Sequence, residues 1–351
     1  MVKQTFNELV KFIRLKYGIV FILLFIIINA FSMLNNNSVR ISLYPEEAEE
    51  LLAFYYEKWG GTYNSKYDAE ILAYYAQVNT DNYNIDEDRV IPAEIKEKIL
   101  NAQTVQNMMK QFYASYTLAK NNEYVDTVLD MRGCRILLES YKSIDFFFVL
   151  IVVVMVCVIF SVDKQRGQED IVKGTRYGNR AVIKAKMLLV SLLVVFLQIV
   201  KLIFLCIPVM KNFYIPDIRI ALQSVDYMHD VASVVSVSEA FVFLVLCETA
   251  GLIFTGLICG FVVTGNAGSA EGFICGFAAA YVPFFLLDRN KFYRNVPLPS
   301  AYLAPYNFLE SIQKYRLQYI LMPILILCLM IIINRVYTYG FGIDKRRLRL
   351  K

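Results

Sequence analysis

The chain of 351 residues contains a single histidine, His229, and its seven cysteines form no CxxC pair. A cluster of histidine ligands and the HExxH pattern of zinc hydrolases are therefore excluded, as are a disulfide framework and a paired-cysteine metal site. The phosphate-binding pattern GxxxxGK(S/T) is also missing, because the glycine-containing segment at 264–272 lacks its lysine. No nucleophile with a neighbouring base is visible, so we expect neither an enzyme activity nor a cofactor in this chain.

Apolar residues, in contrast, are abundant. They make up 57% of the chain, aromatic residues make up 14%, and the mean hydropathy is +0.45, well above the values of an ordinary soluble domain. An apolar helix of about 20 residues crosses a hydrocarbon core of about 30 Å. The sequence predicts an all-α polytopic membrane protein with six transmembrane helices, at 17–34, 144–162, 187–208, 239–263, 269–287 and 317–335.

The first sixteen residues have a helical pattern with two interpretations. Val2, Phe6, Leu9, Val10 and Ile13 fall near one helical face, and the lysines and the arginine fall elsewhere. One interpretation is a basic amphipathic helix lying along the cytoplasmic membrane surface. The other is a plain positively charged flank. A basic flank also precedes signal peptides, but the following run is long and no small-residue cleavage site follows it, so we expect an uncleaved anchor.

Residues 35–143 differ in composition from the rest of the chain. They contain 17 Asp plus Glu against 11 Lys plus Arg and are rich in tyrosine and asparagine. Pro45 and Pro92 each precede an acidic first turn, which is typical of a helix start, and the second of these helices is expected to continue over 93–120. The segment is predicted to be a compact helical domain. Its aromatic residues could form a surface for a substrate, but the domain core is the favoured interpretation.

The distribution of basic residues predicts the orientation in the membrane. Segments 1–17, 163–186 and 335–351 contain 17 Lys plus Arg, whereas the loops 209–237 and 288–318 on the opposite side contain 7. By the positive-inside rule both termini are cytoplasmic in a multi-pass protein of the cell membrane. The helical domain at 35–143, the loop at 209–238 and the loop or short helix at 288–316 are then extracellular. The basic tail at 336–351 is expected to contact anionic lipid, and no nucleic-acid role is assigned to it.

The cytoplasmic segment 163–186 joins the second and third crossings and carries a pattern of charged residues and glycine. An acidic residue ends the second crossing, a glycine follows, then a short amphipathic helical piece, and an arginine and a lysine lead into the third crossing. Here these are Asp163, Gly167, the piece 168–173, Arg180 and Lys186. The pattern and the layout of six crossings resemble the permease subunits of ABC-2 type transporters, although Asp163 replaces the usual glutamate and the proline before the arginine is missing.

The resemblance implies a mechanism in which the loop acts as a coupling helix. The loop would dock on a separate cytoplasmic ABC ATPase, which would bind the ATP and magnesium, and closure of two ATPases would tilt the attached crossings. The mixed charges of Arg166, Glu169, Asp170 and Lys173 favour complementary docking. A solvated loop whose basic residues only set the topology is the alternative. The resemblance further implies a second permease copy or a related permease as partner, and a peptide, an antibiotic or another amphipathic molecule as exported cargo.

Two charged residues lie deep within predicted crossings. Lys201 and Glu248 could pair between the third and fourth crossings, and Gln198 lies one turn from Lys201. Structural pairing, or extension of Lys201 to the interface, is favoured over a substrate contact. GxxxG patterns at Gly256 and Gly260 and at Gly272 and Gly276 predict close helix packing, within the chain or between two copies.

Two other classes of function are weighed against a transporter. A membrane-anchored sensor would bind a ligand with the extracellular domain, but the longest cytoplasmic segment has only about two dozen residues, too short for an output domain. An intramembrane enzyme would need a metal-ligand or nucleophile–base constellation, and none is visible.

Overall fold

The computed structural model describes residues 2–14, 17–43, 46–80, 82–99, 101–123, 125–165, 178–213, 219–225, 228, 235–264, 270, 273–274, 276–278, 302–306 and 309. The chain divides into two compact units. We call residues 1–30, 140–204 and 242–351 the apolar unit, and residues 31–139 and 205–241 the tyrosine-rich unit. The two units are described separately.

The apolar unit is built from long helices. They are α1 (Val2–Arg14), the first part of α2 (Tyr17–Leu43), α8 (Phe146–Gln165), and most of α10 (Gly178–Asn212) and α11 (Val237–Thr264). α8, α10 and α11 are long and apolar enough to cross a membrane, and α1 with 18–33 forms a fourth candidate if the bent pair is counted as one span. The prediction of a mostly helical protein with membrane-length apolar helices is therefore confirmed. Of the two further predicted crossings, 269–287 is described only at 270, 273–274 and 276–278, and 317–335 lies outside the described residues.

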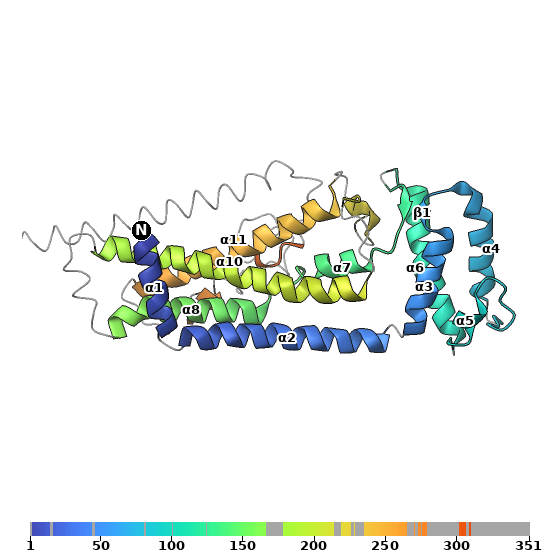
Figure 1. Ribbon diagram of the computed structural model, residues 1–351. Coiled ribbons are helices and arrows are strands. Elements are labelled where there is room, and N and C mark those ends of the chain that lie inside the picture. The colour runs from blue at the N-terminus through green and yellow to red at the C-terminus, as the bar shows by residue number, and fades with distance from the viewer. Residues whose placement is uncertain are drawn as a thin grey trace, which may run out of the picture. The chain divides into compact units, whose positions relative to one another are not determined.

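α8 occupies the centre of the apolar unit. Its side chains, among them Phe148, Val152, Val156 and Phe160, are almost all buried and form a core with residues of α10 and α11. Figure 1 shows these three helices running alongside one another. An apolar helix that is buried on every side is typical of the interior of a bundle.

The tyrosine-rich unit combines helices with one small two-stranded sheet, whose strands are separated in the chain by α4, α5 and α6 (Figure 1). β1 and β2 pair antiparallel, with Gly61 opposite Val128. α3 and α4 both pack on α6. Tyr55, Trp59, Tyr74 and Phe112 are buried and have ring centroids 5.5–6.0 Å apart, so the aromatic residues form the core, which the sequence favoured. The elements are α3 (Glu46–Trp59), β1 (Gly61–Thr62), η1 (Ser65–Tyr67), α4 (Asp68–Val78), α5 (Ala93–Lys96), α6 (Ala102–Asn121), β2 (Thr127–Val128), α7 (Arg132–Glu139) and η2 (Leu222–Ser224).

The helix expected over 93–120 is interrupted. α5 is only four residues long, and α6 starts afresh at Ala102 because the side chain of Asn101 accepts a hydrogen bond from the backbone N–H of Gln103 at 2.8 Å. An asparagine in this position satisfies one of the unpaired N–H groups of a new helix. The pairing of β1 with β2 was not expected either, since two-residue strands leave no alternating pattern in the sequence.

Helix ends differ from the predicted boundaries in the same direction. α2 continues to Leu43, α8 to Gln165, and α10 begins at Gly178. The polar residues that mark the end of an apolar run do not end a helix, because a helix can continue into water or the headgroup layer. Consequently both ends of the predicted loop 163–186 are helical: residues 163–165 belong to α8 and residues 178–186 belong to α10.

Candidate functional site

The two ends of the predicted coupling loop are joined by a buried ion pair. Lys186 Nζ on α10 lies 2.7 Å from Asp163 Oδ2 on α8. Lys186 is only 4% exposed, and its ammonium group lies 5.7 Å from the centre of the Phe160 ring. We call the Asp163–Lys186 pair, with the turns of α8 and α10 that carry it, the loop stem. Because the pair joins the two helices that flank the loop, a force applied to the loop acts on both helices together.

The other predicted coupling residues are placed less fully. Arg180 lies in the first turn of α10, where the structure describes the backbone. The remaining five lie outside the described residues: Arg166, Gly167, Glu169, Asp170 and Lys173.

α1 adds two further charges to the loop stem. Lys11 Nζ lies 3.4 Å from Asp163 Oδ1 and 2.7 Å from Glu8 Oε1. Glu8 and Asp163 are both buried. Carboxylates and ammonium groups alternate along the series Glu8, Lys11, Asp163 and Lys186, and their formal charges sum to zero. A buried charge is tolerated only when it is paired in this way. The sequence did not single out Glu8 or Lys11, because the periodicity of residues 1–16 indicates a helix but not the partner of its polar side.

A second polar cluster joins the three central helices. Lys201 Nζ on α10 lies 2.7 Å from Glu248 Oε1 on α11 and 3.4 Å from Asp145 Oδ2, just before α8. Gln198 Nε2 donates to Glu248 Oε2 at 2.9 Å. The structure therefore brings together Gln198, Lys201 and Glu248, the three polar residues that the sequence placed within apolar runs. Asp145 was missed; it also caps α8 by accepting a hydrogen bond from the N–H of Phe148 at 3.0 Å.

Lys201 is buried next to two aromatic rings. Its ammonium group lies 5.3 Å from the centre of the Tyr141 ring and 5.4 Å from that of Phe148. Gln198 Oε1 is buried and has no hydrogen-bond partner among the described residues. Lys201 contacts two carboxylates, so the cluster carries one more negative than positive charge. This arrangement links α10, α11 and the start of α8 electrostatically.

The glycines of the fourth predicted crossing make contacts within the chain. A Cβ atom added at Gly256 would lie 3.2 Å from a methyl group of Val190 and 3.3 Å from one of Val156, and one at Gly260 would lie 2.8 Å from the Phe160 ring. At Gly276 it would lie 3.0 Å from Cys259. These glycines permit close helix packing, as their spacing predicted. Gly272 lies outside the described residues.

Gly251 makes a close contact that no GxxxG pattern indicated. A Cβ atom at this position would lie 2.9 Å from Cβ of Tyr302 and 3.1 Å from its backbone carbonyl carbon. The segment around Tyr302 belongs to a predicted extracellular loop or short helix, yet it packs on α11 in the apolar unit. A glycine required by such a segment has no partner at helical spacing, so spacing alone does not reveal it.

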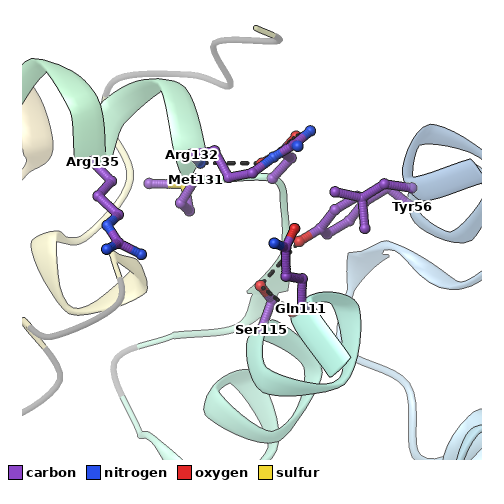
Figure 2. A pocket seen from close by; sticks show the side chains of 8 residues that line it. Tyr56, Gln111, Ser115, Met131, Arg132 and Arg135 are labelled. Atoms are coloured by element: carbon purple, nitrogen blue, oxygen red, sulfur yellow. Dashed lines mark hydrogen bonds and ion pairs between the residues drawn. The ribbon is translucent and has the colours of Figure 1, made fainter. Parts of the chain in front are cut away.

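The tyrosine-rich unit contains a small pocket of about 70 Å³ between α3, α6 and the start of α7. Figure 2 shows Gln111 and Ser115 of α6 facing Tyr56 of α3, with Arg132 across from them. The Tyr56 hydroxyl and Ser115 Oγ are 3.0 Å apart, and Gln111 Oε1 is buried without a hydrogen-bond partner among the described residues. The other lining residues are Leu52, Asp130, Met131 and Arg135. The sequence gave no signal for this pocket, because its residues come from three separated elements.

Arg132 forms the charged wall of the pocket. Its guanidinium group donates to both carboxylate oxygens of Glu49, at 3.1 and 2.8 Å, and to Asp130 Oδ2 at 2.6 Å. Burial alone would lower the pKa of Arg132, but the carboxylates of Asp130 and Glu49 raise it above its ordinary value. The guanidinium is thus held in place and neutralised, and the pocket is not expected to attract an anion.

Comparisons place no known protein beside this chain: no family model, no curated protein and no solved structure matches it. Within the described part of the chain, no group of three or more His, Cys, Asp or Glu side chains could hold a metal ion. The chemical features that remain are two ion-pair clusters linking long apolar helices and one polar pocket in the tyrosine-rich unit.

Proposed function

We propose that the chain is the membrane-spanning permease subunit of an ABC-type exporter, coupled through the loop between α8 and α10 to a separate ATPase subunit. The observation that carries this proposal is the buried Asp163–Lys186 pair, which joins the two helices that flank the loop. A coupling loop must move both of its helices as one body, and a paired charge in a low-dielectric setting resists separation.

The proposed assembly extends the resemblance noted from the sequence. Six crossings place both termini in the cytoplasm and residues 35–143 outside the cell membrane. Two permeases, identical or related, form the translocation path, and the partner ATPases bind ATP and magnesium. A peptide, an antibiotic or another amphipathic molecule is the cargo. The apolar core around α8 supports this reading, because tilting of packed helices can open and close such a path.

Association with an ATPase tests the proposal. The affinity-tagged chain is expected to retain an ABC ATPase from its native membrane, in a nucleotide-dependent way, as identified by mass spectrometry. Charge reversal at Arg166, Glu169 and Asp170 together is expected to abolish retention while membrane insertion is unchanged, because complementary charges position the loop. The matched control reverses one arginine and two acidic residues at exposed positions of the tyrosine-rich unit, Arg89, Asp86 and Glu94. Equal retention by both variants, or none by the wild type, would overturn the proposal.

A ligand-binding role of the tyrosine-rich unit is the second candidate, and the pocket beside Gln111 favours it. Trp59 is the only tryptophan of the chain and lies in α3, which also lines the pocket. Binding of a peptide or another amphipathic molecule is expected to change the Trp59 fluorescence in the wild type and not in Gln111→Leu. A fluorescence response without ATPase association would favour a sensor over a transporter.

A further inference from the structure

α1 has one buried side and one exposed apolar side. Thr5, Glu8 and Phe12 are buried against the apolar unit. On a neighbouring side Val2 is 81%, Phe6 62% and Ile13 41% exposed. The described residues therefore cover the side with Phe12 and leave the most apolar side uncovered. An exposed apolar side flanked by polar residues is typical of a surface that binds a protein or a membrane.

Two basic residues identify the surface that fits. Lys3 and Arg14 are exposed and lie next to the exposed apolar side on the helical wheel. Apolar side chains flanked by lysine and arginine match the boundary between acyl chains and anionic headgroups. α1 also packs, through Phe12, on a core formed by helices that are long and apolar enough to cross a membrane. The occupant of this side is therefore an anionic phospholipid surface.

The buried side of α1 connects it to the loop stem. Lys11 contacts Asp163, which in turn pairs with Lys186. Phe12 seats α1 in the core, and Gly18 permits this, because a Cβ atom there would lie 2.6 Å from the Phe12 ring. One short helix thus contacts the loop stem on one side and exposes a lipid-binding surface on the other.

We propose that α1 makes the loop stem responsive to anionic lipid. Lipid bound to Val2, Phe6, Ile13 and the basic residues holds α1 in the orientation in which Lys11 contacts Asp163. This contact stabilises the closed stem, in which Asp163 is paired with Lys186. Only the consequence for transport rests on the proposed function, namely that the stem carries the coupling loop; the link between lipid and stem does not. By thermodynamic linkage the effect is reciprocal, so opening the stem weakens the binding of α1 to lipid by the same factor.

Hydrogen exchange of the purified full chain tests the link, without any ATPase. Exchange is compared in nanodiscs of phosphatidylcholine and in nanodiscs that also contain phosphatidylglycerol. Amides of α1 and of the stem segments 160–165 and 178–188 are expected to exchange about fivefold or more slowly in the anionic discs, a coupling of ordinary size. High salt is expected to remove most of the difference.

Two variants separate the two sides of α1. Phe6→Ser with Ile13→Ser is expected to abolish the lipid effect on both α1 and the stem. Lys11→Ala is expected to lose the effect at the stem and to reduce, without abolishing, the effect on α1, because α1 still binds lipid but no longer gains from the coupling. Lys11→Arg is expected to restore both effects. The matched comparison Lys3→Ala removes one positive charge from the lipid-binding side of α1 without touching Asp163, so the responses of α1 and of the stem should weaken together instead of separating.

Asp163→Asn tests the reciprocity, since it should reduce the lipid protection of α1 by the factor lost at the stem. Equal exchange of α1 in both lipids would overturn the proposal, as would a stem response that persists in Lys11→Ala. These outcomes do not depend on ATPase association, so failure of the lipid link and failure of the transporter proposal are separate results.

Discussion

The most deeply buried carboxylates of the two units, Asp88 and Glu248, are satisfied by different partners. Asp88 in the tyrosine-rich unit is 1% exposed and Glu248 in the apolar unit is 2% exposed. Asp88 accepts hydrogen bonds from the hydroxyls of Tyr74, at 2.8 Å, and Tyr83, at 2.5 Å, and from two backbone N–H groups. Glu248 accepts from a lysine ammonium and an amide.

The difference follows from what each environment can supply. In the tyrosine-rich unit the turn after α4 offers backbone N–H groups and hydroxyls, which stabilise a carboxylate without a counter-charge. Within long apolar helices the backbone is already hydrogen-bonded, so an opposite charge on a neighbouring helix must stabilise it. Removing one partner should therefore cost single hydrogen bonds in the first case, and leave an unpaired charge in the second.

The largest effect is expected when Lys201 is replaced by Met. Glu248 and Asp145 would then lose their shared cation, and breaking a buried pair in this way costs about 3–5 kcal/mol. Glu248→Gln should cost less, because Lys201 keeps Asp145 as a partner at 3.4 Å. The stability of both variants is measured by thermal unfolding in detergent, with maleimide labelling of the buried Cys247 on α11 as the readout.

The double variant Lys201→Met with Glu248→Gln sharpens this test. Its stability should recover much of the loss, because the buried charge of Glu248 is removed and only Asp145, whose side chain is 32% exposed, remains without its cation. Lys211→Met, an exposed lysine on the same helix, is the matched control and should change stability by less than about 0.5 kcal/mol. Additive losses in the double variant would refute the pairing.

A smaller loss is expected for Asp88→Ala in the tyrosine-rich unit. Two hydroxyls and two N–H groups lose their acceptor, which we expect to cost about 3 kcal/mol, whereas Tyr83→Phe removes one hydrogen bond and should cost about 1 kcal/mol. Burial, reinforced by Asp88, raises the pKa of Tyr83 well above its ordinary value of 10.0, so its hydroxyl stays a donor at neutral pH. Unfolding monitored by Trp59 fluorescence measures both changes.

The exposed neighbour Asp86 provides the control for Asp88. Asp86→Ala also removes an aspartate carboxylate from this turn, but an exposed one, and should change stability by less than about 0.5 kcal/mol. If Asp88→Ala were no worse than Tyr83→Phe, the network around Asp88 would not carry the stability of this turn.

Gly251→Ala is expected to have the next largest effect, in the apolar unit. The added methyl group would contact the backbone of Tyr302, which cannot rotate away, so we expect a loss of about 1–3 kcal/mol. Gly256→Ala should cost less, since its nearest contacts are valine methyl groups at 3.2 and 3.3 Å. Cys157 Sγ and Cys259 Sγ are 3.4 Å apart, so the yield of an oxidative cross-link between α8 and α11 monitors the packing in both variants. Equal losses would show that the contact with Tyr302 does not constrain α11.

The sequence predicted the apolar helices better than their ends. Runs such as 146–162 and 239–263 lie within α8 and α11 because a length of apolar residues is a property of one segment. Where a helix stops depends on caps and on solvent. Asn101 starts α6 through a single side-chain hydrogen bond, and residues 35–43 continue α2 although they are polar.

Contacts at the site were predicted only where a residue was conspicuous by itself. Lys201 and Glu248 stand out because charges are rare in apolar runs. Lys11 and Asp163 are 152 residues apart in the chain, and their contact depends on how α1 and α8 are rotated about their axes. No periodicity contains that information, and the same reason hid Asp145 and the pocket beside Gln111.

The smallest effect is expected at the surface of the tyrosine-rich unit, where Asp68 pairs with Lys120 at 2.6 Å. Hydrogen bonds from Lys120 and Tyr116 hold the pKa of Asp68 below its ordinary value of 3.8. A depressed carboxylate pKa stabilises the fold above the unfolded value, and this contribution disappears as the pH falls through the folded pKa. Thermal unfolding by Trp59 fluorescence should show Asp68→Asn less stable than the wild type at pH 7, with a difference that shrinks as the pH falls from about 5 to about 2. Added salt should also reduce the difference at pH 7, because the pair is partly exposed. A difference independent of both pH and salt would mean that the charge of Asp68 does not stabilise the fold. The tyrosine-rich unit would then gain no stability from this ion pair, just as Asp88 is held by hydroxyl and N–H groups without a counter-charge.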